Sequence, residues 1–338
     1  MPGNKATVGG EVARDYALKH PHTPSLQLAR MLRRDHPALF RSIDSARSSI
    51  RYYRGRQGDR NRGKTRRSGS GVKHTPLPKP EPPSYGVLNL ETYPDIKRWL
   101  LLFDLHVPFQ DNRAVHTALD WACAKENRCD GVIYGGDLGD CYSLSPWIRD
   151  PRRRRFPDEI AAVGQVLDHV EARLHPKATV WKAGNHEYRL ERYLMQRAAE
   201  VFGCEVDGVE QFSFMSFLGL KERNVRFVEA TWPLKYRALT ILHGTEWLGG
   251  AYSPVNPART AYLKMHDCTI LGHYHRTSEH TEPSAGSGQT VTCWSVGCLC
   301  DLHPEYAPLN FWNLGFAVLT TGARWRVENK RIVKDEVV

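Results

Sequence analysis

The chain has 338 residues, a net charge of +10, 41% apolar residues and 25% charged residues, which excludes a fibrous or wholly disordered protein. No stretch approaches the roughly 18 apolar residues of a membrane span, and the start lacks the apolar region of a signal peptide, so we expect no membrane partner. Eight scattered cysteines without a C-x-x-C pair exclude a disulfide framework or a zinc ribbon and favour a cytoplasmic location.

The positive charge is confined to the start of the chain. Residues 1–86 hold 18 Lys and Arg against 6 Asp and Glu, whereas residues 87–338 hold 29 against 31. A segment this basic favours a polyanionic partner, of which nucleic acid is the commonest, although basic tails also serve solubility.

Three short helices are predicted in this basic segment, over residues 11–19, 25–34 and 42–54, with Thr23 as N-cap candidate and Pro24 as first residue of the second. In the third, Ile43, Ala46, Ile50 and Tyr53 share one face and Arg47, Ser48, Arg51 and Arg54 the other. This pattern predicts a helix-turn-helix-like module over residues 1–56. We expect it to bind nucleic acid through Arg47, Arg51 and Arg54, or else to serve assembly, with its basic face solvated.

Residues 57–86 are dense in Gly, Ser, Pro and Arg and cannot bury enough apolar surface to fold alone. We therefore place a flexible linker at residues 57–90 and a second domain at residues 91–338.

Short apolar runs then alternate with amphipathic helices, which predicts strand-helix-strand units around a largely parallel sheet. The predicted strands cover residues 99–103, 131–134 and 179–182, and the predicted helices residues 113–125, 158–174 and 187–199. Later strands, which would complete a mixed or second sheet, are predicted at residues 225–229, 238–242, 268–271, 291–296, 315–320 and 324–333.

Polar blocks follow five of these strands. They are Asp104-Leu105-His106, Gly136-Asp137, Gly184-Asn185-His186-Glu187, His243-Gly244 and Gly272-His273-Tyr274-His275. Open α/β sheets place ligand sites at the carboxyl ends of their strands, so these blocks should converge. Residues at i and i+2 of an extended segment also point the same way. Carboxylate and amide oxygens with imidazoles, and no thiolate, suit hard-to-borderline divalent ions.

The order of these blocks resembles the calcineurin-like metallophosphoesterase superfamily, whose pattern D-x-H, G-D, G-N-H-[DE], H and G-H-x-H is met in full over about residues 98–320. The surrounding sequence is similar to members found in bacteriophage and prophage genomes, for which the location would be the host cytoplasm. The resemblance implies an α/β fold, a four-layer α/β/β/α sandwich with mixed sheets.

The resemblance also implies the role of each residue. Asp104, His106 and His275 would bind one metal ion, Asn185, His243 and His273 the other, and Asp137 would bridge them. The ions would be Mn²⁺, with Fe, Zn²⁺, Mg²⁺ and Ni²⁺ as alternatives. His186 would be the catalytic acid, and a metal-bound hydroxide would attack phosphorus.

One departure bears on the substrate. The protein phosphatases of the superfamily carry G-D-x-x-D-R-G, but no arginine follows Asp140 here. Arg189 or Arg192 would replace it, unless they are solvated helix charges. Arg152 and Arg155 are the first and last residues of a run of four arginines that would contact a nucleic-acid backbone, unless that run is a solvated loop. The role of Asp140 stays open.

Three functions are compatible with these patterns. The first is a nuclease or nucleic-acid end phosphatase targeted by the basic module. The second is a phosphomonoesterase or phosphodiesterase for nucleotides or other small molecules, with the module used for assembly. The third is a DNA-binding regulator with an inactive phosphoesterase domain, which the complete ligand set disfavours. Only 63 residues follow His275, so we expect no docked ATPase partner of the kind that repair nucleases of the superfamily bind.

Overall fold

The structure is a computed structural model that describes residues 7–55, 79, 85–148, 150, 152, 155–247, 254–283, 286 and 288–338. The chain divides into two compact units, residues 1–83 and 84–338. Most of the predicted linker lies outside the described residues. Its last part does not behave as a linker, because Leu88 and Asn89 form β1 and pair with β8 (Leu234–Tyr236).

The described part of the first unit contains three helices, α1 (Val8–Lys19), α2 (Ser25–Asp35) and α3 (Ile43–Arg54). Helix α1 begins three residues earlier than predicted, because the Thr7 side chain accepts a hydrogen bond from the backbone N–H of Gly10 and caps it. The N-cap of α2 is Pro24 itself, so the prediction that Thr23 caps this helix is wrong.

One small apolar core holds these helices together. Its buried members are Ala13, Ala17, Leu28, Ala29, Leu32, Phe40, Ala46, Ile50 and Tyr53. Ile43, which the helical pattern placed on the same face, is 40% exposed, because it begins the helix at the edge of this core.

The described part of the second unit contains two large sheets. The seven-stranded sheet has the order β15 (Glu336–Val337), β14 (Arg326–Val333), β13 (Gly315–Thr320), β2 (Arg98–Leu102), β3 (Gly131–Tyr134), β4 (Ala178–Lys182) and β7 (Val225–Val228). The six-stranded sheet has the order β1, β8, β9 (Leu239–Leu242), β10 (Thr269–Leu271), β12 (Thr290–Ser295) and β11 (Ser278–Pro283). Strands β2, β3, β4 and β7 are parallel, as are β9, β10 and β12, so both sheets are mixed.

The unit also contains α5 (Asn112–Cys123), α6 (Phe156–Leu174), α7 (Tyr188–Arg197), α8 (Phe214–Phe217) and α9 (Pro257–Met265). A short hairpin pairs β5 (Glu205–Val206) with β6 (Val209–Glu210). The 3-10 turns η2 (Leu90–Thr92) and η3 (Tyr142–Leu144) complete the set.

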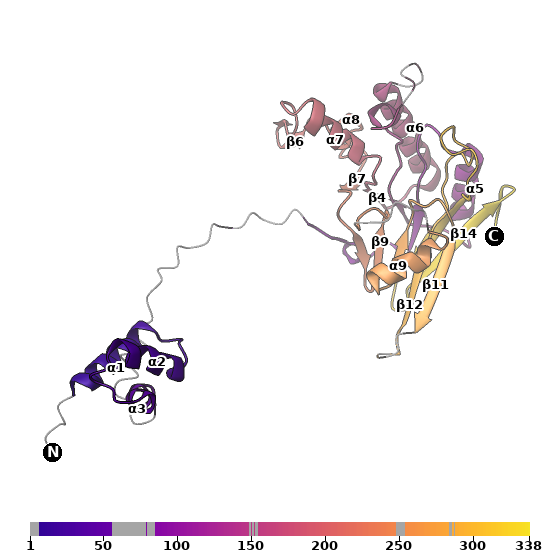
Figure 1. The fold of residues 1–338 in the computed structure, drawn as a ribbon. Helices are drawn as coiled ribbons and strands as arrows, with labels where there is room; N and C mark the ends of the chain where they lie inside the picture. The colour runs from indigo at the N-terminus through magenta and orange to yellow at the C-terminus, as the bar shows by residue number, and fades with distance from the viewer. Residues whose placement is uncertain are drawn as a thin grey trace. The chain divides into compact units, whose positions relative to one another are not determined.

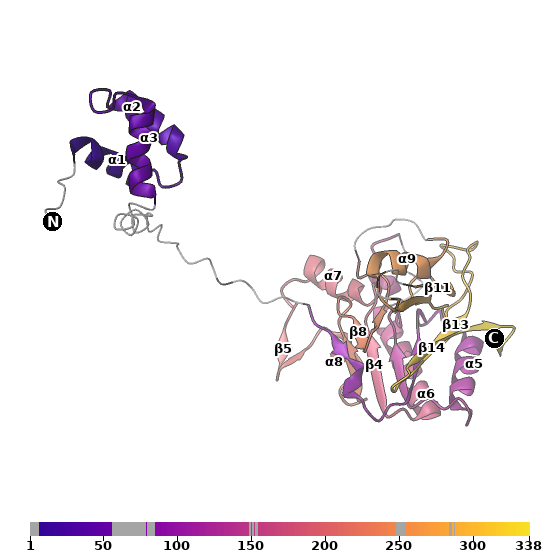
Figure 2. The same ribbon diagram turned by 90° about the horizontal axis from the view of Figure 1, so that it is seen from below.

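Side-chain alternation along the strands produces separate apolar layers. On β2, Leu100 and Leu102 face a core shared with α5 and α6, whereas Trp99 and Leu101 face a core between the two sheets. A third, smaller core lies between α9 and the six-stranded sheet. The unit is therefore a four-layer α/β/β/α sandwich, with α5 and α6 on one outer face and α9 on the other (Figures 1 and 2).

Elements that were not predicted from the sequence include β1, β8, β11, β15 and α9, and β1 and β15 have only two residues each. Strand β11 contains only polar residues and a proline and lies at a sheet edge, so it has no apolar run to detect. Strand β8 has three residues, and α9 buries only the small side chains Ala258 and Ala261 besides its first proline. Within the described part of the chain, no helix has both the length and the apolar character needed to cross a membrane.

Candidate metal centre

The five polar blocks lie at the carboxyl ends of five parallel strands. Asp104, Asp137 and Asn185 follow β2, β3 and β4 of the seven-stranded sheet. His243 and the His273–His275 block follow β9 and β10 of the six-stranded sheet. The site is thus formed where the carboxyl edges of both sheets meet.

The backbone at this edge is unusual. Five of its residues have a positive φ, between 48° and 66°, a backbone conformation that residues other than glycine adopt rarely. They are Asp104, His106, Asp137, His273 and His275. These positions are therefore not the expected extended segments, in which side chains at i and i+2 point the same way. Left-handed backbone, and not strand alternation, aims these side chains, and it concentrates local strain at the site.

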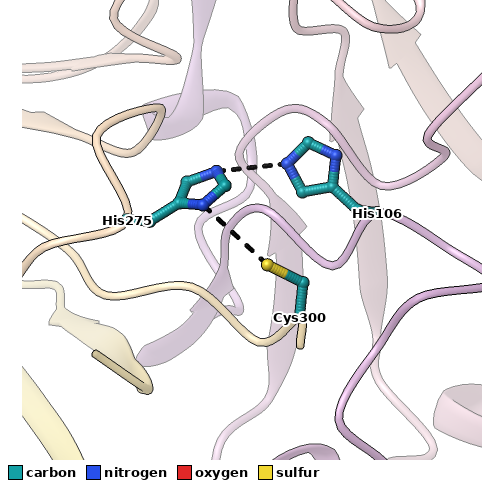
Figure 3. Close-up of side chains that lie close together, drawn as sticks. All are labelled: His106, His275 and Cys300. Carbon is teal, nitrogen blue, oxygen red and sulfur yellow. Dashed lines mark hydrogen bonds between the residues drawn. The ribbon is translucent and has the colours of Figure 1, made fainter. Parts of the chain in front are cut away.

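A first group of ligand atoms comes from Asp104, His106 and His275. The two imidazole Nε2 atoms of His106 and His275 lie 3.1 Å apart (Figure 3). Oδ1 of Asp104 lies 3.4 Å from Nε2 of His275. Three potential ligand atoms from two strand ends, those of β2 and β10, therefore point at one small volume.

The second group comes from Asn185, His243 and His273. Oδ1 of Asn185 lies 3.0 Å from Nε2 of His243, and the rings of His243 and His273 meet edge-on with centroids 5.2 Å apart. Nδ1 of His243 faces the carbonyl oxygen of Gly135 at 3.3 Å, so a proton on Nδ1 leaves the lone pair of Nε2 directed at the group.

Asp137 lies between the two groups. Its Oδ2 is 3.2 Å from Nε2 of His243 and 3.9 Å from Nε2 of His106, whereas its Oδ1 accepts a hydrogen bond from the backbone N–H of His186 at 2.9 Å. One carboxylate oxygen is thus shared between the groups, which is the position that a bridging ligand requires.

Among the described residues, three sets of side chains have ligand atoms within 4.8 Å of one another, close enough to hold a cation. They are His106 with Asp137 and His186, Asp137 with His243 and His273, and His106 with His275 and Cys300. The buried Oδ1 of Asp104 accepts no hydrogen bond within the described structure, so it is a donor atom that a cation would satisfy. Oxygen and imidazole donors at these distances fit divalent ions of the Mn²⁺ or Zn²⁺ type.

The acidic and basic groups compensate one another. Burial alone would lower the pKa of His243, but the Asp137 carboxylate outweighs it and raises the pKa to about 9. In the same way Asp104 outweighs burial and raises the pKa of His275 to about 10. For His273, burial, assisted by the charge of His243, lowers the pKa to about 4. The imidazolium charges of His243 and His275 thus balance the carboxylates of Asp137 and Asp104, and a bound cation would take over that balance and free the two Nε2 lone pairs.

His186 lies beside this cluster, and its proton arrangement follows from its contacts. Nδ1 donates to the backbone oxygen of Asp140 at 2.7 Å, and Nε2 accepts a hydrogen bond from the Arg189 guanidinium at 2.9 Å. The same Nε2 lies 3.7 Å from Oδ2 of Asp137. The imidazole is therefore held with Nε2 facing the carboxylate of Asp137 and with the Arg189 guanidinium beside it.

The role of Asp140, which the sequence left open, is visible in the structure. Its Oδ1 lies 3.0 Å from Nδ1 of His106 and 3.2 Å from Nδ1 of His186. Burial alone would raise the pKa of Asp140, but these two hydrogen-bonded imidazoles lower it below its usual range. Asp140 therefore orients one candidate metal ligand and the candidate acid together.

Glu187, the last residue of the Gly184–Glu187 block, joins two of the strand-end loops. Its carboxylate accepts backbone N–H groups of Asp137 at 3.0 Å, Gly139 at 3.0 Å and Gly184 at 2.7 Å. A Cβ on Gly184 would lie 2.2 Å from Oδ1 of Asp137, so only glycine permits this approach. Burial, assisted by the charge of Asp137, raises the pKa of Glu187 to about 7.

A buried ion pair fixes the loop that carries His243. Nζ of Lys182, which is fully buried at the end of β4, lies 2.8 Å from Oε1 of Glu246. The Glu246 carboxylate accepts the backbone N–H groups of His243 and Gly244, each at 2.7 Å. This pair connects the two sheets at the site. A lysine at the end of an otherwise apolar strand was the sequence signal that could have revealed it.

The predicted substrate-binding arginines differ in whether they reach the site. Only Arg189 contacts the site, where its guanidinium also donates to the backbone oxygen of Asp140 at 2.8 Å. Arg152 is 88% exposed and pairs with Asp150, and Arg155 approaches Asp158 at 4.0 Å. Arg192 is partly exposed on α7. Residues 153 and 154 of the basic run lie outside the described residues.

The arginines of α3 also differ from one another. Arg54 donates to the backbone oxygens of Thr23 at 2.6 Å and His20 at 2.5 Å, so it ties the end of α3 to the turn between α1 and α2. Arg47 is half-buried, whereas Arg51 is exposed. Of these three residues, Arg51 is the one presented to solvent.

Comparison with known proteins gives distant structural likenesses. No family model and no curated protein matches the chain. Wild-type Vps29 from Entamoeba histolytica complexed with Zn²⁺ is 13% identical with a TM-score of 0.37, covering 71% of this chain and 96% of that one. Vps29 from Cryptosporidium parvum is 9% identical with a TM-score of 0.35, covering 72% and 95%. The Pseudomonas putida nuclease MPE is 14% identical with a TM-score of 0.29, covering 68% and 85%. At TM-scores below 0.5 these likenesses carry no argument about activity.

Proposed function

We propose that the protein is a phosphoesterase that uses two divalent metal ions, Mn²⁺ foremost, and acts on nucleic acid. The observation that carries the proposal is the position of Asp137, whose Oδ2 faces imidazole nitrogens of both ligand groups at 3.2 and 3.9 Å. The motif resemblance to the calcineurin-like metallophosphoesterases supports the same reaction class. Two such ions would draw charge from the phosphoryl oxygens and supply the activated water.

The residues of this chain would divide the remaining work. Asp137, Asp104 and the imidazoles hold the ions, and Asp140 and Glu187 keep those ligands in place. His186 faces the shared carboxylate through Nε2, which would take up a proton from solvent and deliver it to the leaving oxygen. Arg189, which donates to that nitrogen at 2.9 Å, would transfer its hydrogen bond to the phosphoryl group when a substrate enters.

Arg189 also bears on the substrate class. The protein phosphatases of the superfamily that this chain resembles hold phosphate with the arginine of G-D-x-x-D-R-G. Cys141 stands at that position here. Arg189 supplies a guanidinium from α7 instead. Together with the basic residues 1–86, this favours a nucleic-acid substrate over a phosphoprotein, with nucleotides and other small esters as the second class to be compared.

A substrate panel tests this proposal. With Mn²⁺ added, we expect hydrolysis of bis-aryl phosphate, nucleotides or nucleic acids, complete inhibition by a chelator, and phosphoserine peptide turnover that is at least 10-fold slower. Mg²⁺ and Zn²⁺ provide the metal comparison. Absence of metal-dependent hydrolysis of any ester would favour a binding protein with an inactive catalytic unit, and a preference for phosphopeptides would contradict the substrate class.

The first unit gives a second prediction. If it binds nucleic acid through α3, Arg51→Ala in the full-length protein should lower the slope of log affinity against log salt by roughly one, because one phosphate contact and its released counterion are lost. Fluorescence anisotropy with labelled single- and double-stranded DNA and RNA measures this slope.

Matched variants separate binding from folding. Arg14→Ala, on α1 and paired with Asp15, should leave the salt slope unchanged. Arg54→Ala removes two hydrogen bonds to backbone oxygens and should lower the melting temperature of the unit. If Arg51→Ala binds with an unaltered slope, the unit serves assembly and its basic face is merely solvated.

A further inference from the structure

A recess adjoins the candidate metal centre on the side of His106. It has a volume of about 290 Å³, and His106 and Asp140 form the wall nearest the ligand groups. Ligand pockets of roughly 300 Å³ and above are common in proteins, so a recess of this size accepts about one ring system with its attached sugar. A group bound in it would lie next to the ester that the site holds.

Aromatic rings supply much of its wall, and they come from separate segments. Phe109, after the first motif, meets Tyr142 of η3 with ring centroids 6.2 Å apart. Tyr306 meets Trp312 with centroids 6.1 Å apart, both from the loop after Cys300. Flat rings on more than one side favour a flat occupant, because each ring face offers a stacking surface.

The recess is connected to the ligand groups through Trp312. Its ring contacts the ring of His275 with centroids 4.1 Å apart. Cys300, which also lines the recess, lies 3.9 Å from Nδ1 of the same imidazole (Figure 3). An occupant stacked on Trp312 therefore lies one ring away from a candidate metal ligand.

The loop that carries Tyr306 and Trp312 is braced by its own polar groups. The amide nitrogen of Asn310 donates to the backbone oxygens of Leu302 at 2.6 Å and Ala307 at 2.8 Å, and its Oδ1 accepts the backbone N–H of Trp312 at 2.8 Å. Three bonds from one side chain hold the loop across its width. The aromatic wall is thus formed before a ligand arrives, which reduces the entropic cost of binding.

Charge excludes an anionic occupant. Besides Asp140, the residues lining the recess include Asp301 and Glu305, and the described lining contains no lysine or arginine. A second phosphate would meet these carboxylates with no lysine or arginine of the described lining to offset its own charge. An uncharged aromatic ring meets no such penalty.

We propose that this recess binds the nucleobase of the nucleotide that carries the scissile phosphate, stacked against Tyr306 and Trp312. The inference rests on the proposed phosphoesterase function and names the substrate group that the site recognises. It makes Tyr306 a specificity-determining residue, since Tyr306 is 72% exposed and belongs neither to the two ligand groups nor to the pair formed by His186 and Arg189.

Matched esters with and without a base test the proposal on the full-length Mn²⁺-loaded protein. The monoester pair is adenosine 5'-monophosphate and ribose 5-phosphate. The diester pair is the dinucleotide of two adenosines and the same ribose–phosphate–ribose diester without its two adenines. Stacking of one base is worth roughly 10- to 100-fold. We expect kcat/KM for the base-bearing ester to exceed that of its partner by this factor. Tyr306→Ala should lower kcat/KM about 10-fold for the base-bearing ester alone.

Two further variants act as controls. Tyr306→Phe keeps the ring and should keep the preference. Phe311→Ala removes an aromatic side chain that is 80% exposed in the same loop but does not line the recess, and it should behave as the unaltered protein. Equal kcat/KM for both members of a pair, or an equal loss on both in Tyr306→Ala, would overturn the proposal.

Calorimetry distinguishes this failure from failure of the proposed function. If no ester is hydrolysed, the phosphoesterase proposal fails. The recess is then judged by titrating adenosine 5'-monophosphate and ribose 5-phosphate into the Mn²⁺-loaded protein. Tighter binding of the base-bearing ligand that Tyr306→Ala abolishes supports the recess, and equal binding of the two ligands refutes it. Hydrolysis of ribose 5-phosphate at the full rate would leave the function standing and refute the recess alone.

Discussion

Asp137→Asn should remove both metal ions from the catalytic unit and abolish turnover. In the structure Oδ1 of Asp137 accepts the backbone N–H of His186, which fixes the orientation of the carboxylate. An asparagine would keep that bond with its carbonyl oxygen. Its amide nitrogen would then stand at the position of Oδ2, with two N–H donors directed at the imidazoles of His243 and His106 where a shared anionic ligand is needed.

Elemental analysis of the purified variant measures the metal loss, and hydrolysis of an aryl phosphate measures the activity. Asp104→Asn provides the contrast, because Asp104 belongs to one ligand group and that variant should lose one ion and keep the other. Circular dichroism confirms that both variants are folded. An Asp137→Asn protein that retains two ions per chain would show that this carboxylate does not bridge the groups.

The sequence was sufficient to find the strand ends that carry the site. Each polar block follows an apolar run, and parallel strands in a sandwich bring such ends together, so proximity follows from topology. It was not sufficient to predict the directions in which the side chains point. Asp104 and His106 have φ values of 54° and 48°, a conformation that the residue types do not announce and that packing of the surrounding loops must impose.

Residues that support the ligands were harder to predict than the ligands. Asp140 and Glu246 act through hydrogen bonds to His106 and to the backbone of His243, at distances that depend on how loops fold back. Cys300 approaches His275 from a segment 25 residues away. Polar residues in loops are common, so nothing local in the sequence marks those that reach the site.

The nine predicted strands lie within two residues of their bounds in the structure, whereas β11 was missed because its side chains are polar and β8 because it has only three residues. The contacts of Arg54 were likewise not predictable from the sequence pattern. A helical pattern places it on a basic face, but only the packing of α3 against the turn after α1 shows that backbone oxygens occupy its guanidinium. Periodicity predicts which face a residue shares, and tertiary contacts decide what it does there.

His186→Ala should lower the hydrolysis rate by roughly 10²- to 10⁴-fold while both metal ions remain bound, because it removes a proton donor and not a ligand. The alternative is concrete, since His186 lies close enough to His106 and Asp137 for the three to hold a cation together. Elemental analysis separates the two roles. Nδ1 of His186 already donates to Asp140, so Nε2, which accepts from Arg189 in this structure, is the nitrogen that would take up a proton and carry it to the leaving oxygen.

His186→Asn refines the test, because its amide N–H can replace the Nδ1 donor but offers no titratable nitrogen at the position of Nε2. Both variants should therefore be equally slow, and both should depend on the pKa of the leaving group more steeply than the unaltered enzyme does. His169→Asn, an exposed residue of α6, is the matched control and should retain full activity. A His186→Ala protein stripped of one ion would make this imidazole a ligand, and the proton would then have to come from solvent.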